Sequence, residues 1–171
     1  MKNVFIILLT VLAVLGTSDA GYIVIDAAVA DLGGGRWKYS YTISNIADEQ
    51  ASVVASWLTI WFDYADYSNF EITTADALGW SESIIQPEPL TYSGAGYDLG
   101  NLSQPLTEGN YLSGFSIAFD YSGAEAPLPA GQKFEIVNPD TWQTAYTGYT
   151  VPEPATLALL AIGAIGFRKR K

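Results

Sequence analysis

Two tryptophans are the residues whose type and spacing best suit ligand binding. Over residues 56–64, bulky side chains fall on both alternating faces of an expected strand, with Trp57, Thr59 and Trp61 sharing one of them. The two indoles would then lie about 13 Å apart on that face. Exposed rings at such a spacing suit stacking on an extended polysaccharide, since an indole is a rigid apolar plate with a polar edge. The alternative is a central strand covered on both sides, or tryptophans packed under a loop.

Two carboxylates follow where that segment ends. Asp63 and Asp66 lie close in sequence to Ser68 and Asn69. Carboxylate, amide and hydroxyl oxygens are the ligands that calcium prefers. The spacing lacks the alternating acids and the glycine of an EF-hand loop. We therefore expect solvated loop acids here, with a calcium site at Asp63 and Asp66 as the alternative, and no other cofactor.

The residue types needed for most catalytic chemistry are missing. Histidine and cysteine are both absent from the sequence. This removes the commonest general base, the histidine-dependent triads, the usual zinc ligands and any disulfide framework. No GxSxG or HExxH pattern is present either. The sixteen acids of residues 21–150 make a pair at glycosidase spacing nearly inevitable, so such a pair carries no information. We expect a non-enzymatic protein.

The net charge of the domain further limits the classes of partner that the sequence predicts. Residues 21–150 hold sixteen acids and three cations, a net charge of −13. A field of that sign repels phosphate backbones and anionic lipid surfaces, so nucleic acid is not an expected partner. The ordinary interpretation is solubility of an exported domain, and binding of divalent cations at the surface is the alternative.

The segments that must position these residues read as β-strands. Residues 37–44 alternate cleanly between bulky and polar side chains, and residues 33–35 are three glycines, which suit a tight turn before that strand. Further strands are expected at 22–29, 53–64, 115–120, 134–137 and 142–150, whereas proline and glycine weaken the pattern between 66 and 110. No stretch carries a helical period. The sequence predicts one all-β domain over 21–150, an antiparallel β-sandwich of about seven to nine strands.

Both ends of the chain differ from this domain. At the N-terminus, Lys2 precedes an apolar run over 4–15, and small residues stand at positions 18 and 20. This organisation is typical of a signal peptide over residues 1–20 that signal peptidase removes. A buried helix is the less favoured interpretation, because the run shows no polar face.

The C-terminus has three parts in a fixed order. It begins with a proline-rich motif, continues with an uncharged run over 155–167 and ends in four cations. The motif is Val151, Pro152, Glu153 and Pro154, and the cations are Arg168, Lys169, Arg170 and Lys171. The run would form a helix of about 20 Å. A core helix at the end of a chain has no need of four terminal cations. A short membrane segment needs them, because cations on the cytoplasmic side fix its orientation. We expect residues 155–167 to enter the membrane.

This tail resembles the PEP-CTERM sorting signal of bacterial exosortase substrates, with Pro152, Glu153 and Pro154 as the motif. The resemblance implies an exported precursor anchored transiently in the membrane. It also implies an exosortase-like transpeptidase or protease that cuts near the motif and releases or re-attaches the body. The expected product is a structural or adhesive protein of the cell surface or extracellular matrix, such as a biofilm matrix. The alternative is a carbohydrate-binding module for extracellular polysaccharide that uses Trp57 and Trp61.

Overall fold

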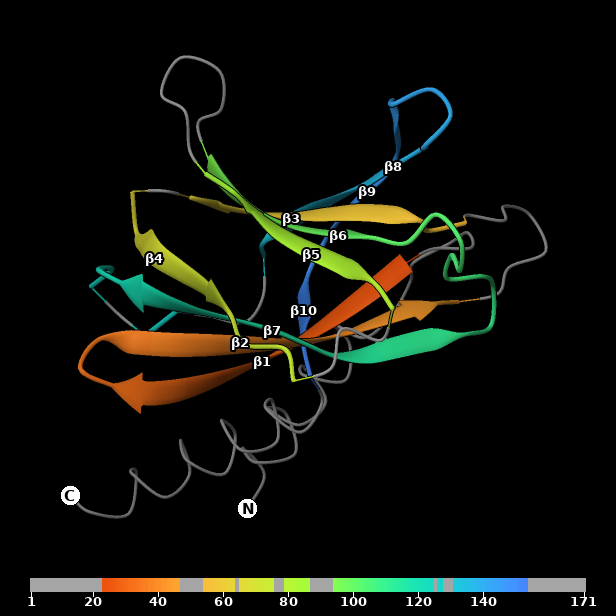
Figure 1. Cartoon of the computed structure of the whole chain (residues 1–171). Helices are drawn as coiled ribbons and strands as arrows, with labels where there is room; N and C mark the ends of the chain where they lie inside the picture. Colours follow the sequence, from red (N-terminus) through yellow and green to blue (C-terminus); the bar gives the residue numbers. More distant parts are fainter. Residues whose placement is uncertain are drawn as a thin grey trace, which may run out of the picture.

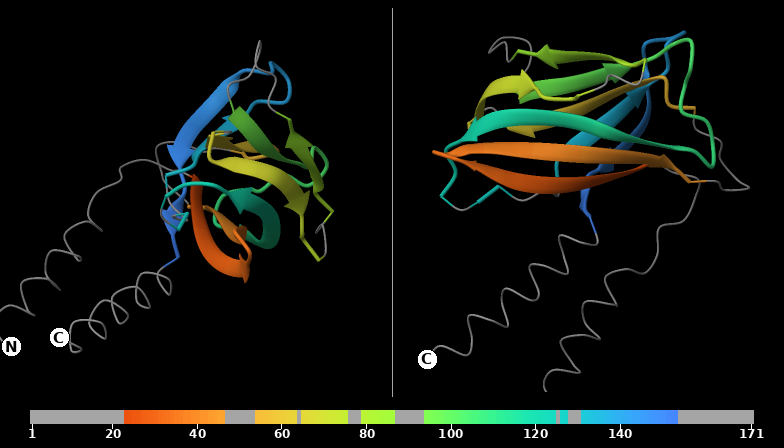
Figure 2. Two further views of the ribbon diagram at one scale, coloured as in Figure 1. Left: turned by 90° about the vertical axis from the view of Figure 1, so that its left-hand side faces the viewer. Right: turned by 60° about the horizontal axis from the view of Figure 1, so that its bottom comes forward.

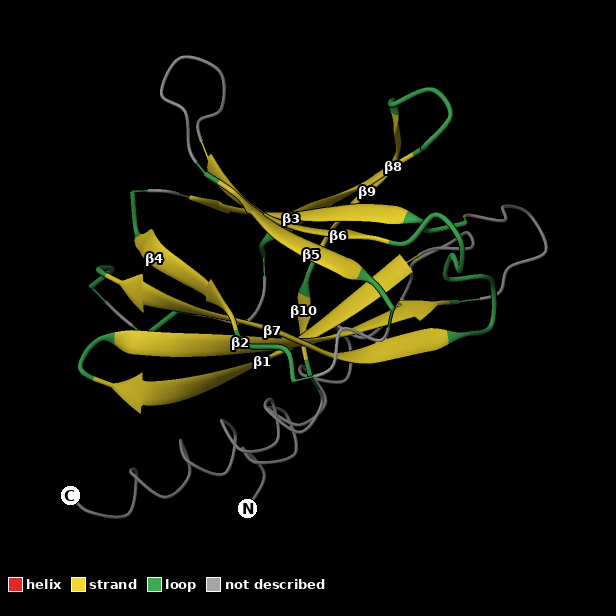
Figure 3. Cartoon of the chain, in the orientation of Figure 1, coloured by secondary structure: helices red, strands yellow, loops and turns green. Residues whose placement is uncertain are grey.

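The computed structural model describes residues 23–46, 54–63, 65–75, 79–86, 94–124, 126–127 and 131–153. These residues form ten strands and no helix, arranged as two five-stranded sheets packed face to face (Figures 1 and 3). The predicted all-β sandwich is confirmed, with a strand number slightly above the expected range. The predicted signal peptide, membrane segment and terminal cations lie outside the described residues.

The first sheet has the order β10-β1-β2-β7-β4. Its strands are β1 (Ile23–Gly33), β2 (Arg36–Asn45), β4 (Tyr67–Ile72), β7 (Tyr111–Tyr121) and β10 (Val151–Pro152). All neighbouring pairs in it are antiparallel except β1 and β10, which run parallel. This sheet therefore contains the one exception to the predicted antiparallel pairing among the described strands.

The second sheet has the order β5-β6-β3-β8-β9, with every pair antiparallel. Its strands are β3 (Trp57–Asp63), β5 (Ser81–Ile85), β6 (Gly94–Gly100), β8 (Lys133–Val137) and β9 (Thr144–Tyr149). Figure 2 shows this sheet lying across the first one from two further directions. Strand β3 is central in it, as one interpretation of its two bulky faces predicted.

The glycine run joins β1 to β2 as expected. Gly33, Gly34 and Gly35 all have positive φ, at 86°, 65° and 82°, a conformation that other residues rarely adopt. The carboxylate of Asp31 accepts a hydrogen bond from the Gly33 amide at 2.7 Å and helps to hold the turn. The long, regular pairing that follows places the alternating apolar residues of both strands on the inner face.

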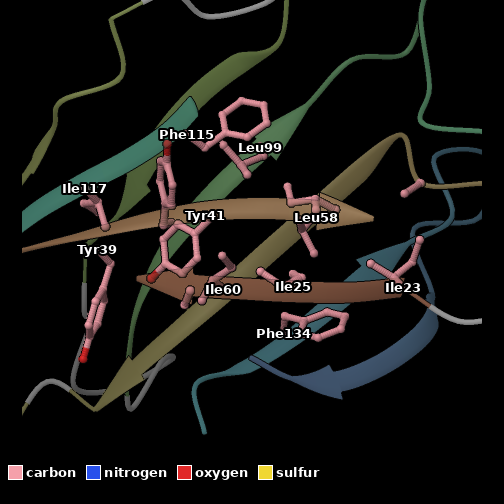
Figure 4. Close-up of a cluster of buried hydrophobic side chains, with 14 of the residues drawn as sticks. Ile23, Ile25, Tyr39, Tyr41, Leu58, Ile60, Leu99, Phe115, Ile117 and Phe134 are labelled. Carbon is pink, nitrogen blue, oxygen red and sulfur yellow. The ribbon is translucent and has the colours of Figure 1, made fainter. Parts of the chain in front are cut away.

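The core fills the space between the sheets (Figure 4). Tyr39, Tyr41 and Ile43 of β2 are at most 1% exposed, which confirms the predicted alternation of that strand. Phe115, Ile117 and Phe119 of β7 are fully buried and face the same space. Packing of aromatic rings is dense, since the Tyr39 and Phe119 ring centres lie 4.7 Å apart. Apolar packing stabilises this domain without disulfides.

The weak pattern between 66 and 110 resolves into three short strands, β4, β5 and β6. Strand β6 reads Gly-Ala-Gly-Tyr-Asp-Leu-Gly, yet all of its residues after Gly94 are buried. A strand covered on both faces loses the polar alternation that marks a half-exposed one. Its glycines leave room for side chains of neighbouring strands, so the local sequence does not read as a strand.

Candidate functional site

Trp57 and Trp61 lie on the outer face of the central strand β3. Leu58, Ile60 and Phe62 are 1%, 0% and 3% exposed and face the core, so the predicted division of the strand into two faces is confirmed. Both tryptophans are half-buried rather than covered or fully exposed. The outer face of β3 therefore presents two partly exposed indoles to solvent.

The ring of Trp57 lies against the backbone of β6. Its register partner is Gly100, and a methyl group at that glycine would come within 2.7 Å of a Trp57 ring carbon. The indole Nε1 donates a hydrogen bond to the Asp98 carboxylate at 2.9 Å. The ring also contacts Trp142 in an edge arrangement, with centres 5.7 Å apart, and Trp142 itself is 65% exposed. These contacts hold the Trp57 ring in one orientation.

Trp61 lies on the same face and is also held by a carboxylate, which comes from β8, the neighbour of β3 on the side away from β6. Its Nε1 donates to a carboxylate oxygen of Glu135 on β8 at 3.3 Å. The second oxygen of Glu135 forms an ion pair with Lys133 at 2.5 Å. Each indole is thus paired with a carboxylate, and the two carboxylates come from the strands on either side of β3.

A polar row crosses the face between the two indoles. Thr59 is paired in register with Asp98 on one side and with Glu135 on the other. Its hydroxyl donates to Asp98 at 2.6 Å. Asp98 is 7% exposed, and this burial raises its pKa, although the hydrogen bonds from Thr59 and Trp57 partly oppose the shift. We call Trp57, Trp61, Thr59, Asp98 and Glu135 the indole face.

Sequence reasoning missed the two carboxylates of the indole face. Glu135 is one of many acids, and nothing local relates it to a tryptophan 74 residues earlier in the chain. Asp98 carried a weak signal, because it is the one acid within a glycine-flanked apolar stretch. The order of the strands, which brings β6 and β8 to the two sides of β3, decides both pairings.

Asp63 and Asp66 take part in the turn that follows β3. The Asp63 carboxylate accepts a hydrogen bond from the Ala65 amide at 3.0 Å, and the Asp66 amide donates to the Asp63 carbonyl at 3.2 Å. Within the part of the chain that the structure describes, no group of three acidic, histidine or cysteine residues is placed to hold a metal ion. Calcium binding at these two aspartates stays a prediction.

The predicted sorting motif begins inside the first sheet. Val151 and Pro152 form β10 and pair with Asp26 and Ala27 of β1. The Glu153 amide donates to the Ala27 carbonyl at 3.0 Å. Pro154, the apolar run and the four cations lie outside the described residues. Among the residues that the structure describes, no helix has the length and apolar character needed to cross a membrane.

Comparison with known proteins identifies the tail. Residues 150–171 match the PEP-CTERM protein-sorting motif. The match confirms the resemblance seen in the sequence, and the motif implies export, sorting to the cell surface and processing by an exosortase. No curated protein matches the chain.

Proposed function

We propose that this chain is a non-enzymatic structural or adhesive protein of the cell surface or extracellular matrix. The sorting motif at residues 150–171 is the observation that carries the proposal, because it is a delivery signal attached to a single β-sandwich. The absence of histidine and cysteine from the sequence supports a role that depends on surface contacts rather than on catalysis.

The terminal cations offer a test of delivery. Replacing Arg168, Lys169, Arg170 and Lys171 with glutamine removes the charge that holds the apolar segment in its orientation. We expect the full-length precursor to accumulate unprocessed, as followed by pulse-chase labelling and mass spectrometry of the C-terminus. The control is Lys38→Gln, which removes a cation from within the domain and should be processed like the wild type. Lys2 is not a suitable control residue, since it belongs to the predicted signal peptide. Normal processing of the tail variant would contradict the assigned role.

A second candidate function is polysaccharide binding through the indole face. Two half-buried indoles, each fixed by a carboxylate, flank a row of polar groups on one side of the second sheet. Rings that are already oriented lose little conformational freedom when a sugar stacks on them. The partly exposed Glu135 carboxylate can accept hydrogen bonds from sugar hydroxyls, whereas Thr59 and Asp98 are buried and help to hold the Trp57 ring in place. The strong negative charge of the domain disfavours acidic polysaccharides and favours neutral or amino sugars.

The binding assay uses retention of the exported protein on insoluble cellulose and chitosan, with alginate beads as the acidic comparison. Trp57→Ala and Trp61→Ala should each weaken retention by about tenfold, which corresponds to about 1.4 kcal/mol. Trp37→Ala is the matched control, because Trp37 is also a half-buried tryptophan but lies on the first sheet. Equal retention of all three variants, or no retention of the wild type on any of these polymers, would remove this candidate and leave the structural role.

A further inference from the structure

The start of the sorting motif is part of the folded domain and not of a free linker. The chain leaves β9 in the second sheet, passes through Thr150 and enters the first sheet as β10 (Figure 1). There, Val151 pairs with Asp26 and Pro152 with Ala27, and the Glu153 amide donates to the Ala27 carbonyl. One backbone edge of the motif is therefore already occupied by β1.

The residue before the motif is anchored as well. Thr150 is 2% exposed, and its amide donates to the Gln132 carbonyl at 2.9 Å. Its hydroxyl donates to the Gln132 side chain at 2.6 Å and accepts from the Gln132 amide at 3.2 Å. Gln132 is itself 7% exposed. These bonds fix the point at which the tail leaves the sandwich, so the motif cannot move away from β1 by a rotation further upstream.

We propose that the pairing of β1 with β10 is a latch that controls access of the processing enzyme to the sorting motif. This inference rests on the proposed exosortase processing. A peptide segment enters a protease or transpeptidase site in an extended form with its backbone edges available, as in strand addition. Strand β10 must therefore separate from β1 before the processing enzyme can bind residues 151–153. It has two residues and its proline lacks an amide hydrogen, so this opening is local and leaves the sandwich intact.

The pairing can be locked reversibly, because the natural chain has no cysteine. Asp26 and Val151 are register partners that face outward from adjacent strands. Adjacent strands lie about 4.8 Å apart, within the range of about 4.4–6.8 Å between the Cα atoms of a disulfide. Asp26→Cys combined with Val151→Cys should thus form a bond across β1 and β10 in the exported precursor. The motif prolines and Glu153 remain unchanged.

The experiment follows processing of the full-length chain in exosortase-containing cells by pulse-chase labelling, with the disulfide verified on non-reducing gels. We expect the oxidised double variant to be processed at least tenfold more slowly than the same variant after reduction, because only the disulfide differs between the two forms. The matched control locks β1 to β2 at the register pair Ala30 and Lys38, which leaves β10 free. This control should be processed normally under both conditions.

Two outcomes would overturn the latch in distinguishable ways. If the oxidised Asp26→Cys/Val151→Cys chain is processed as fast as its reduced form, β10 need not leave β1, and the latch is refuted while exosortase processing stands. If the wild type is not processed at all, the proposed sorting role fails and the latch fails with it.

A six-residue glycine-serine insertion between Thr150 and Val151 gives the opposite perturbation. It should raise the processing rate, and a rate no higher than that of the wild type would also count against the latch.

Discussion

Tyr41 offers a sharp test of the packing in this sandwich. Its side chain points from β2 into the space between the sheets and is 1% exposed (Figure 4). Its hydroxyl has no hydrogen-bond partner among the described residues. Burial raises the pKa of this phenol well above its usual range, because the phenolate would lack water. The hydroxyl therefore stays neutral, and its hydration is lost on folding without a replacement.

We expect Tyr41→Phe to stabilise the domain. An unsatisfied buried polar group costs about 1–3 kcal/mol, and the substitution removes that penalty while keeping the ring. The void left by one oxygen, on the order of 10 Å³, costs about 0.2 kcal/mol at about 24 cal/mol per Å³. The net effect is a gain of about 0.8–2.8 kcal/mol in the free energy of unfolding.

The measurement is equilibrium unfolding in urea at neutral pH, in which the midpoint should rise while the slope stays constant. Tyr39→Phe is the matched control, since Tyr39 is the preceding inward-facing residue of the same strand. Its hydroxyl bonds to the Tyr67 hydroxyl at 3.2 Å and accepts from Gln132 at 3.5 Å. That variant should lose about 0.5–1.5 kcal/mol. A loss of stability in Tyr41→Phe would show that the hydroxyl has a partner and would refute the reasoning.

Two further predictions concern the indole face and the acid limit of stability. In Gly100→Ala the new methyl group would lie 2.7 Å from a Trp57 ring carbon, so the ring must move. We expect a changed near-ultraviolet circular dichroism spectrum and weaker polysaccharide retention. An unchanged spectrum would contradict the contact. Hydrogen bonds from Asn69 and Arg36 lower the pKa of Asp120, so the stability it adds is present above the ordinary carboxyl pKa of about 3.9 and is lost as the pH falls through the lower folded value. Arg36→Gln should therefore reduce the dependence of the urea midpoint on pH below about pH 4, and an unaltered dependence would exclude this contribution.

The regular strands were predictable because their signals are local. The alternation over residues 37–44 and 115–120 has the two-residue period of a strand, and the bulky residues of both segments face the core as expected, although Ser116 and Ala118 on the other face of β7 are buried as well. Strand β6 was not predictable, since it is buried on both faces and its glycines accommodate side chains from β3 and β5. At Gly96, for example, a methyl group would lie 3.2 Å from Ile85. Burial of that kind follows from neighbours that are distant in sequence.

The sequence by itself determined the delivery signal and the division of β3 into two faces. A sorting tail is recognised from a linear order of motif, apolar run and cations, and a strand's faces follow from its own period. Only the tertiary structure decided that Asp98 and Glu135 orient the two indoles and that the sorting motif begins as an edge strand on β1. Both depend on which strands become neighbours and in what register. Contacts between segments as distant in sequence as Asp26 and Val151 set that pairing through the burial of the whole core, and no local stretch of residues specifies it.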